Sequence, residues 1–213
     1  MAHDSDPELL VALALRLKGF GEVEAVAAVH GLDVEHVNAA LAALVERGHC
    51  MAREVEGVEK FILTPTGREA GEAGLRADLD SSGSRDTVRS AYDEFLVLNG
   101  SMLQLCTDWQ VRSTGGDGQQ LNDHTDEDYD QEVLARLVDL DGELRRVLAG
   151  LSVAMSRYGA YQRRFRDALD RLLGGDLDYF TKPLIPSYHT VWFELHEDLL
   201  ATLGINRADE GST

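Results

Sequence analysis

The stretch GLDVEHVNAALAALVERGHC, residues 31–50, decides how the first third of the chain is expected to fold. Asp33 is a favourable helix N-cap residue, because its side-chain oxygen can accept a hydrogen bond from a backbone N–H of the first turn. Apolar residues then recur at spacings of three and four, at Val37, Ala40, Leu41 and Leu44. The spacing predicts an amphipathic helix that buries these side chains, and Gly48 predicts where it ends.

The neighbouring segments predict further short elements. Residues 8–18 and 22–30 are each expected to form a helix. After the third helix, the segment CMAREVEGVEKFILT has two short alternating runs around Gly57, which predict a β-hairpin. Thr64 and Pro65 mark the start of a fourth helix, with an N-cap followed by proline at the first helical position. Three helices, a two-stranded hairpin and a further helix, in this order, are typical of a winged helix.

The rest of the chain is expected to be a separate, all-helical domain. The composition of SSGS at residues 81–84 predicts a linker over 81–86. Apolar periodicity then predicts helices near 87–112, 126–156, 158–173 and 188–203, and leaves open a break in the second one at Gly142 or Gly150. A mainly α chain is therefore expected, with these parts: a winged helix at 1–80, a linker at 81–86, a helical dimerisation or effector domain at 87–207 and a disordered tail at 208–213.

The amino-acid composition limits which classes of protein the chain can belong to. The 213 residues contain 44% hydrophobic residues, which is normal for a globular chain. No apolar run approaches the roughly 18 residues of a membrane span, and the acidic N-terminus lacks the features of a secretory signal. Cys50 and Cys106 match no disulfide or metal-ligand pattern. A cytoplasmic protein without membrane contact is expected, and the abundant Ala, Gly, Asp and Arg suggest a GC-rich bacterial source.

Residues 8–79 resemble winged-helix transcriptional regulators of the MarR and PadR kind. The resemblance rests on the helix-turn-helix text EVEAVAAVHGLDVEHVNAALAALVERGHC and on LTPTGREA after the hairpin. Residues 86–207 resemble a helical domain that follows such winged helices in actinobacterial regulators, through CTDWQVR, NDHTDEDYD and YHTVWFELHEDLLATLG. The resemblance implies a homodimeric, DNA-binding transcriptional regulator whose helical domain mediates dimerisation or senses a small-molecule or protein effector.

The resemblance also implies which residues would contact DNA. Exposed residues near the start of the second helix of a helix-turn-helix contact base edges, while nearby cations hold phosphates. The expected base-contacting residues are Glu35, His36 and Asn38. The expected phosphate contacts are Arg53, Lys60, Arg16, Lys18 and Arg68.

The net charge of −18 leaves a second hypothesis open. Residues 1–80 contain 7 Lys or Arg and 15 Asp or Glu, and residues 81–213 contain 13 and 23, so neither part is basic. Such a field repels nucleic acid unless cations are concentrated locally. The alternative is a winged helix that contacts a protein instead of DNA.

The helical region contains one basic stretch, at residues 145–171. Its seven arginines alternate with tyrosines and Phe165, and they could bind an anionic effector through Arg157, Arg163 and Arg164 or could neutralise acids of the same domain. Trp109, Tyr188 and Trp192 could wall an effector pocket between helices or could be ordinary core.

Two segments resemble metal sites without matching one. His189 and His196 lie two helical turns apart, about 10.5 Å along the axis. The simpler interpretation is a helix that leaves its histidines partly exposed and buries Trp192, Leu195, Leu199 and Leu200. The segment LNDHTDEDYDQE lacks the spacing of a calcium loop, and Thr125 followed by Asp128 instead predicts a helix cap. No nucleotide, cofactor or catalytic motif is present, so no cofactor and no metal are expected. An enzyme that uses the groups at 108–112 and 189–197 is the third and weakest hypothesis.

Overall fold

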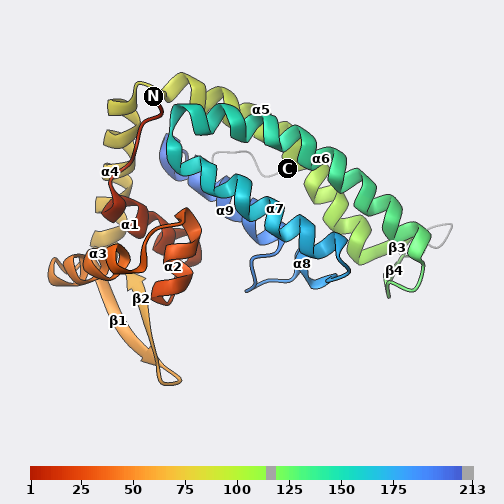
Figure 1. The fold of residues 1–213 in the computed structure, drawn as a ribbon, viewed down its shortest axis with the longest axis horizontal. Helices are drawn as coiled ribbons and strands as arrows, with labels where there is room; N and C mark the ends of the chain where they lie inside the picture. The colour runs from red at the N-terminus through yellow and green to blue at the C-terminus, as the bar shows by residue number, and fades with distance from the viewer. Residues whose placement is uncertain (114–118, 208–213) are drawn as a thin grey trace.

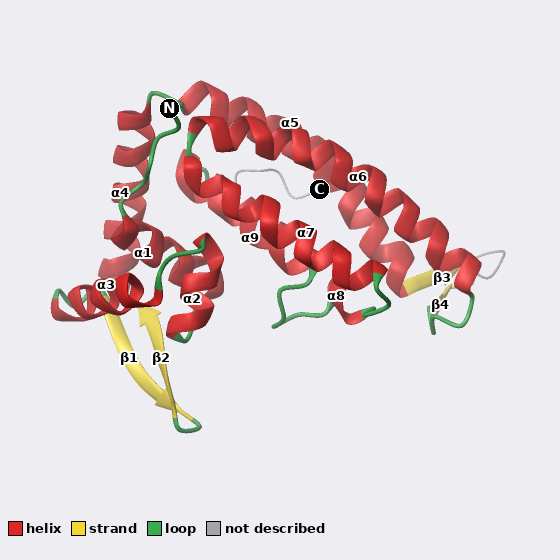
Figure 2. Ribbon diagram, in the orientation of Figure 1, coloured by secondary structure: helices red, strands yellow, loops and turns green. Residues whose placement is uncertain are grey.

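The computed structural model describes residues 1–113 and 119–207, and this part of the chain is mainly helical (Figures 1 and 2). Its N-terminal part contains the predicted elements in the predicted order. They are α1 (Pro7–Lys18), α2 (Val23–His30), α3 (Val34–Glu46), β1 (Cys50–Val55), β2 (Val58–Leu63) and α4 (Pro65–Ser82).

Local sequence signals explain these elements. The Asp33 carboxylate accepts a hydrogen bond from the Glu35 N–H at 2.8 Å and so caps α3, as predicted. The four apolar residues of the opening stretch are all buried: Val37, Ala40, Leu41 and Leu44. Glu56 and Gly57 have φ values of 55° and 78°, which make a two-residue turn and close β1 onto β2 as an antiparallel hairpin.

The C-terminal part is built on two long helices that lie side by side, α5 and α6, with α7 and α9 packed against them (Figure 1). Its elements are α5 (Arg85–Gln110), β3 (Val111–Ser113), β4 (Gln119–Leu121), α6 (Glu127–Ala154), the 3₁₀ helix η1 (Ser156–Tyr158), α7 (Gly159–Leu173), α8 (Asp178–Thr181) and α9 (Tyr188–Leu203). We refer to this part as the helical body. No described helix is long and apolar enough to cross a membrane.

The structure corrects three expectations about this region. The helical body is not all-helical, because β3 and β4 form a short hairpin between α5 and α6. No linker occupies residues 81–86, since α4 continues to Ser82 and α5 begins at Arg85. The serines were misleading because the Ser82 hydroxyl donates to the Leu79 carbonyl at 2.7 Å and so satisfies one of the last carbonyls of α4. α6 passes without a break through Gly142 and Gly150. The tail expected at 208–213 lies outside the described residues.

The N-terminal part and the helical body share elements at their junction. Leu79 of α4 is buried in the core of the helical body, and Ala201 of α9 is buried in the N-terminal core. The N-terminal segment adds a second connection, because the His3 N–H bonds the Ala154 carbonyl at 2.9 Å and the His3 ring bonds Asp78 at 2.6 Å. These contacts hold the two parts together and leave α3 and the β1–β2 hairpin projecting from the molecule (Figure 1).

Candidate interaction surface

The exposed side of α3 contains the three residues expected to contact bases. Glu35, His36 and Asn38 are all exposed, as the sequence predicted. The Asn38 side-chain amide donates to the Val34 carbonyl at 3.0 Å, and the His36 ring lies 4.0 Å from the Asp33 carboxylate. α3 itself contains no Lys or Arg, so its exposed side presents hydrogen-bonding and acidic groups together with the apolar side chains of Val34 and Val45.

Three of the five cations expected to hold phosphates are instead paired with carboxylates. Arg16 bonds Glu72 at 2.5 Å. Lys18 lies 3.3 Å from Glu194, which belongs to α9. The third pair joins the hairpin to the segment before α2: the Lys60 ammonium is 3.7 Å from Glu22. These side chains stabilise the packing of α1 and the hairpin and do not form a free cationic surface.

The remaining two expected cations are available to a partner. Arg53 of β1 and Arg68 of α4 are exposed, and neither has an ion-pair partner among the described residues. The position of Arg53 follows from the strand register, in which it faces Lys60 across the hairpin.

The hairpin has two chemically different faces. Phe61 and Cys50 point inward and are buried. The opposite face, which we call the outer hairpin face, consists of the alternate residues Met51, Arg53, Val55, Val58, Lys60 and Ile62, and is extended by Phe20 and Glu22. Phe20 belongs to it because Gly21 pairs with Phe61 and the Lys60 ammonium lies 5.5 Å from the Phe20 ring.

The outer hairpin face is apolar as well as charged. Its five apolar side chains are each between 36% and 54% exposed: Phe20, Met51, Val55, Val58 and Ile62. Clustered exposed apolar side chains on a projecting element are typical of an interaction site. The sequence showed the alternation in the hairpin, but only the pairing of Gly21 with β2 adds Phe20 to this face.

Two of the three arginines of the candidate anion site, Arg157 and Arg164, are paired with carboxylates of the same domain. Arg157 is fully buried, and its guanidinium donates to the Asp198 carboxylate at 2.7 Å. Arg164 pairs with Glu194 in the same way. Arg163 is exposed on α7, beside Gly31. Internal neutralisation, the alternative considered for this stretch, therefore accounts for Arg157 and Arg164.

A buried histidine lies where α2 meets the helical body. His30 packs edge-on against Tyr161 with ring centroids 6.4 Å apart. Neither ring nitrogen has a hydrogen-bond partner within the described part of the chain. Burial lowers the pKa of His30 to about 3, so the ring is neutral at physiological pH.

Trp109, Tyr188 and Trp192 are ordinary core, which is the second of the two possibilities that the sequence left open. Tyr188 and Trp192 stack on each other at 6.4 Å and are buried. Trp109 belongs to a different group, with Phe180 at 4.9 Å and His124 at 4.4 Å. The three residues therefore do not line one cavity, because side-chain packing fills the space between α5, α7 and α9.

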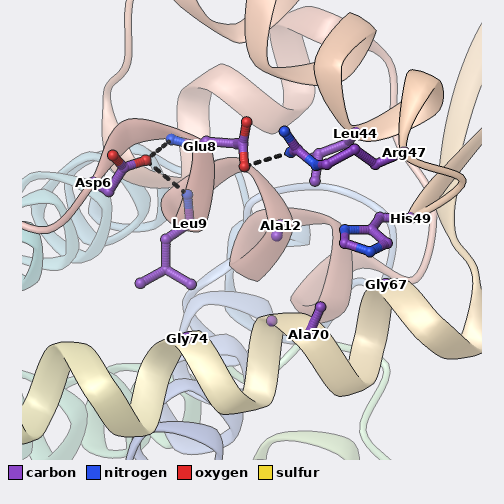
Figure 3. Close-up of a pocket in the computed structure, with 11 residues that line it drawn as sticks. Asp6, Glu8, Leu9, Ala12, Leu44, Arg47, His49, Gly67, Ala70 and Gly74 are labelled. Carbon is purple, nitrogen blue, oxygen red and sulfur yellow. Dashed lines mark hydrogen bonds and ion pairs between the residues drawn. The ribbon is translucent and has the colours of Figure 1, made fainter.

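A groove of about 420 Å³ lies beside the ends of α1, α3 and α4, and Figure 3 shows residues that line it. An ion pair between Glu8 and Arg47, at 2.5 Å, lies at one side of it. Glycines of α4 line the other side, and one of them, Gly67, lies so close to the His49 carbonyl that a Cβ would approach it to 1.8 Å. Gly67 and Gly74 let α4 lie close to the His49 backbone and to the Leu9 side chain of α1, which is a structural role.

A second hollow, of about 370 Å³, lies where α8 approaches the β3–β4 hairpin. Its wall includes His124, whose Nδ1 lies 2.9 Å from the Asp130 carboxylate and whose φ is 58°. The sequence did not single out this pair. It did predict a cap nearby, but the N-cap of α6 is Asp126 and not Thr125, because the Asp126 side chain accepts from the Tyr129 N–H at 3.1 Å.

The two histidines of α9 differ in burial. His196 is buried beside Tyr92 and Phe95, contrary to the expected partial exposure, while His189 is half-buried. Within residues 1–113 and 119–207 there is no group of three or more His, Cys, Asp or Glu side chains arranged to hold a metal ion.

Comparison of the chain with protein-family models, with curated proteins and with solved structures found no match.

Proposed function

We propose that α1 to α4 form a winged helix, and that its α3 and its hairpin recognise another protein rather than DNA. The order of elements supports the first part, together with the strand-like pairing of Gly21 with Phe61, which adds a third backbone segment to the hairpin. The helical body holds this unit at a junction made of buried contacts and ion pairs.

The observation that supports a protein partner is the scarcity of free cations. Residues 20–64 contain three Lys or Arg and eight Asp or Glu. Two of the three cations are already paired, Arg47 with Glu8 and Lys60 with Glu22. A duplex carries one negative charge per ~1.7 Å of its axis, so DNA would meet an acidic surface with few phosphate contacts. The apolar outer hairpin face is better suited to a protein surface.

DNA binding is the second candidate, and the free side chains of Arg53 and Arg68 favour it. Two phosphate contacts per chain, or four in a homodimer, give a slope of log affinity against log salt of about −2 to −4, since each neutralised phosphate contributes ~0.9. If the chain regulates transcription, it would then do so by binding its DNA site with low affinity.

A homodimer is part of the same proposal, with the helical body as the dimerising part. Leu96 and Leu103 of α5 and Phe193 of α9 are large apolar side chains at its surface and provide contact area. Sedimentation equilibrium tests this, and the Leu103→Glu variant is expected to shift the protein towards the monomer.

Photo-crosslinking from defined positions decides between the two candidate targets. A photoreactive amino acid at His36 or at Val55 is expected to crosslink the same protein in the native host, whereas the same group at the exposed Arg166 of the helical body is not. Purified partner and purified chain must then associate, and Glu35→Lys must weaken that association. Crosslinks to DNA from both positions, with retarded migration of specific genomic fragments at low salt, would overturn the proposal in favour of DNA.

A further inference from the structure

β1 is a free strand edge. In the described part of the chain β1 pairs only with β2. The two-residue turn at Glu56 and Gly57 makes Val55 and Val58 a hydrogen-bonded pair, and such pairs alternate along an antiparallel ladder.

The free backbone groups of β1 can be assigned from this alternation. Ala52 and Glu54 occupy the non-hydrogen-bonded positions, so their N–H and C=O groups point away from β2. The neighbouring strand agrees with this assignment, because Phe61, opposite Ala52, directs its own N–H and C=O to Gly21 on the other side of β2 at 2.9 and 3.1 Å. Both backbone groups of Ala52 and of Glu54 are therefore free to bond another strand.

The side chains beside this edge define what a further strand would meet. Met51, Arg53 and Val55 point to the outer hairpin face and all are exposed. Arg53, the middle one, has no ion-pair partner within the described residues. Glu54 and Ala52 point to the other face and are exposed as well. The edge thus presents an apolar, a cationic and a second apolar side chain on one face, and an acidic side chain on the other.

We propose that β1 binds an extended segment of a partner protein as an added antiparallel strand. This inference rests on the proposed role in protein recognition and names the chemistry of the partner. The segment has apolar residues beside Val55 and Met51 and an acidic residue beside Arg53. A basic residue of the partner segment lies beside Glu54, between the apolar residue beside Val55 and the acidic residue beside Arg53. Backbone hydrogen bonds supply affinity and the alternating side chains supply specificity, as in other cases of strand addition.

A second copy of the chain fits this edge poorly. Two β1 strands paired about Arg53 would place one Arg53 opposite the other, and pairing about Glu54 would place two acids together; like charges directly opposite each other are destabilising. Pairing centred on Ala52 would require the second hairpin to lie beside Cys50, which is buried at the base of β1. The charges therefore favour a different protein.

The test uses the full chain and a capped synthetic peptide. The peptide has valine at its first and fifth positions, lysine second and glutamate third, and a matched peptide has lysine in place of the glutamate. We expect the glutamate peptide to shift the backbone amide resonances of Ala52 and Glu54. We expect it to bind about threefold to tenfold more tightly than the lysine peptide, the range expected for replacing an attractive cross-strand pair by a repulsive one. Arg53→Glu should reverse this preference, and Arg166→Glu, a control of equal charge change on α7, should not.

A second variant tests the backbone contribution. Ala52→Pro removes an N–H that points away from β2, and proline is tolerated at such edge positions, so the hairpin should persist while peptide binding is lost. Retention of the cross-strand contacts between β1 and β2 in the nuclear Overhauser spectrum verifies that the hairpin is intact.

Several outcomes would overturn the inference. The first is an absence of amide shifts at ~1 mM peptide, the weakest affinity of interest. The second is equal binding of the two peptides. The third is broadening of the β1 resonances with protein concentration alone, which would indicate pairing with a second copy of the chain. Shifts at β1 produced by duplex DNA and not by peptide would do the same. If the peptide fails while crosslinks from His36 and Val55 still reach one protein, strand addition is wrong and protein recognition stands. Loss of both results removes both proposals.

Discussion

Replacing Asp198 with asparagine removes the negative charge from a network that lies between α7 and α9. The Asp198 carboxylate accepts hydrogen bonds from the Arg157 guanidinium at 2.7 Å, from the Tyr161 hydroxyl at 3.1 Å and from the Thr202 hydroxyl at 3.1 Å. The side chains of Arg157 and Asp198 are 1% and 0% exposed, so water cannot replace the lost charge. Burial also raises the pKa of Tyr161, which stays protonated as a donor.

The size of the expected loss in unfolding free energy follows from the buried Arg157 guanidinium, which loses its charged partner in the variant. Breaking a buried ion pair from one side costs about 3–5 kcal/mol, because one charge stays buried without compensation. Asparagine keeps one acceptor oxygen, so we expect Asp198→Asn to lower the free energy of unfolding by about 3 kcal/mol. This is a large part of the ~5–15 kcal/mol typical of a folded domain. With a urea m-value of ~2–3 kcal/mol/M, the midpoint should fall by about 1–1.5 M.

Urea unfolding followed by circular dichroism and by tryptophan fluorescence measures this shift. Asp80→Asn is the matched control, since Asp80 pairs with Arg85 at an exposed site and its loss should cost no more than ~0.5 kcal/mol. The double variant Arg157→Met, Asp198→Leu should be more stable than Asp198→Asn, because no charge is left unpaired. A midpoint for Asp198→Asn equal to that of the control would refute the reasoning, since it would mean that water reaches the network.

Three further predictions follow from buried groups. His30 has a pKa of about 3 in the fold and 6.5 as its unperturbed value, so the unfolded chain takes up a proton first as the pH falls. Stability should therefore be lost from about pH 6.5 downward, by about 2 kcal/mol at pH 5 relative to pH 8, and His30→Leu should remove this component from a series of urea titrations. Gly67→Ala should lower the thermal midpoint, because its Cβ would meet the His49 carbonyl; Gly71→Ala, whose Cβ would meet only the Ala12 side chain at 3.9 Å, should leave it unchanged or raise it. Burial raises the pKa of Cys106 to about 11, so its reaction with a disulfide reagent at pH 8 should be slow, and rapid labelling of the folded chain would contradict this.

The fold could be predicted where signals are local. The helix at 34–46 followed from a cap and a periodic apolar stripe, and α9 occupies the 188–203 range that apolar spacing predicted. The errors occurred where composition was the only guide. SSGS suggested a linker, yet its serines bond helix carbonyls. The polar residues that follow α5 in the sequence did not indicate the β3–β4 hairpin.

The candidate site was less predictable than the fold. Glu35, His36 and Asn38 are exposed on α3 because helical periodicity determines which residues face inward. The expected phosphate contacts were chosen by charge alone, and three of them are paired with carboxylates far along the chain, such as Lys18 with Glu194. No spacing rule connects such residues, since their distance depends on how α1 packs against α9.

The sequence by itself determined the secondary structure of the N-terminal part, the inward side of α3 and the acidity of the whole chain. These properties depend on neighbours within a few residues or on composition, so the geometry of a helix and a sum of charges are enough to obtain them. The tertiary structure alone decided which cations are free, that Arg157 is buried beside Asp198, and that Phe20 joins the outer hairpin face. Each of these depends on side chains distant in sequence that meet only when helices and strands pack, and that meeting sets whether a charge is paired or available to a partner.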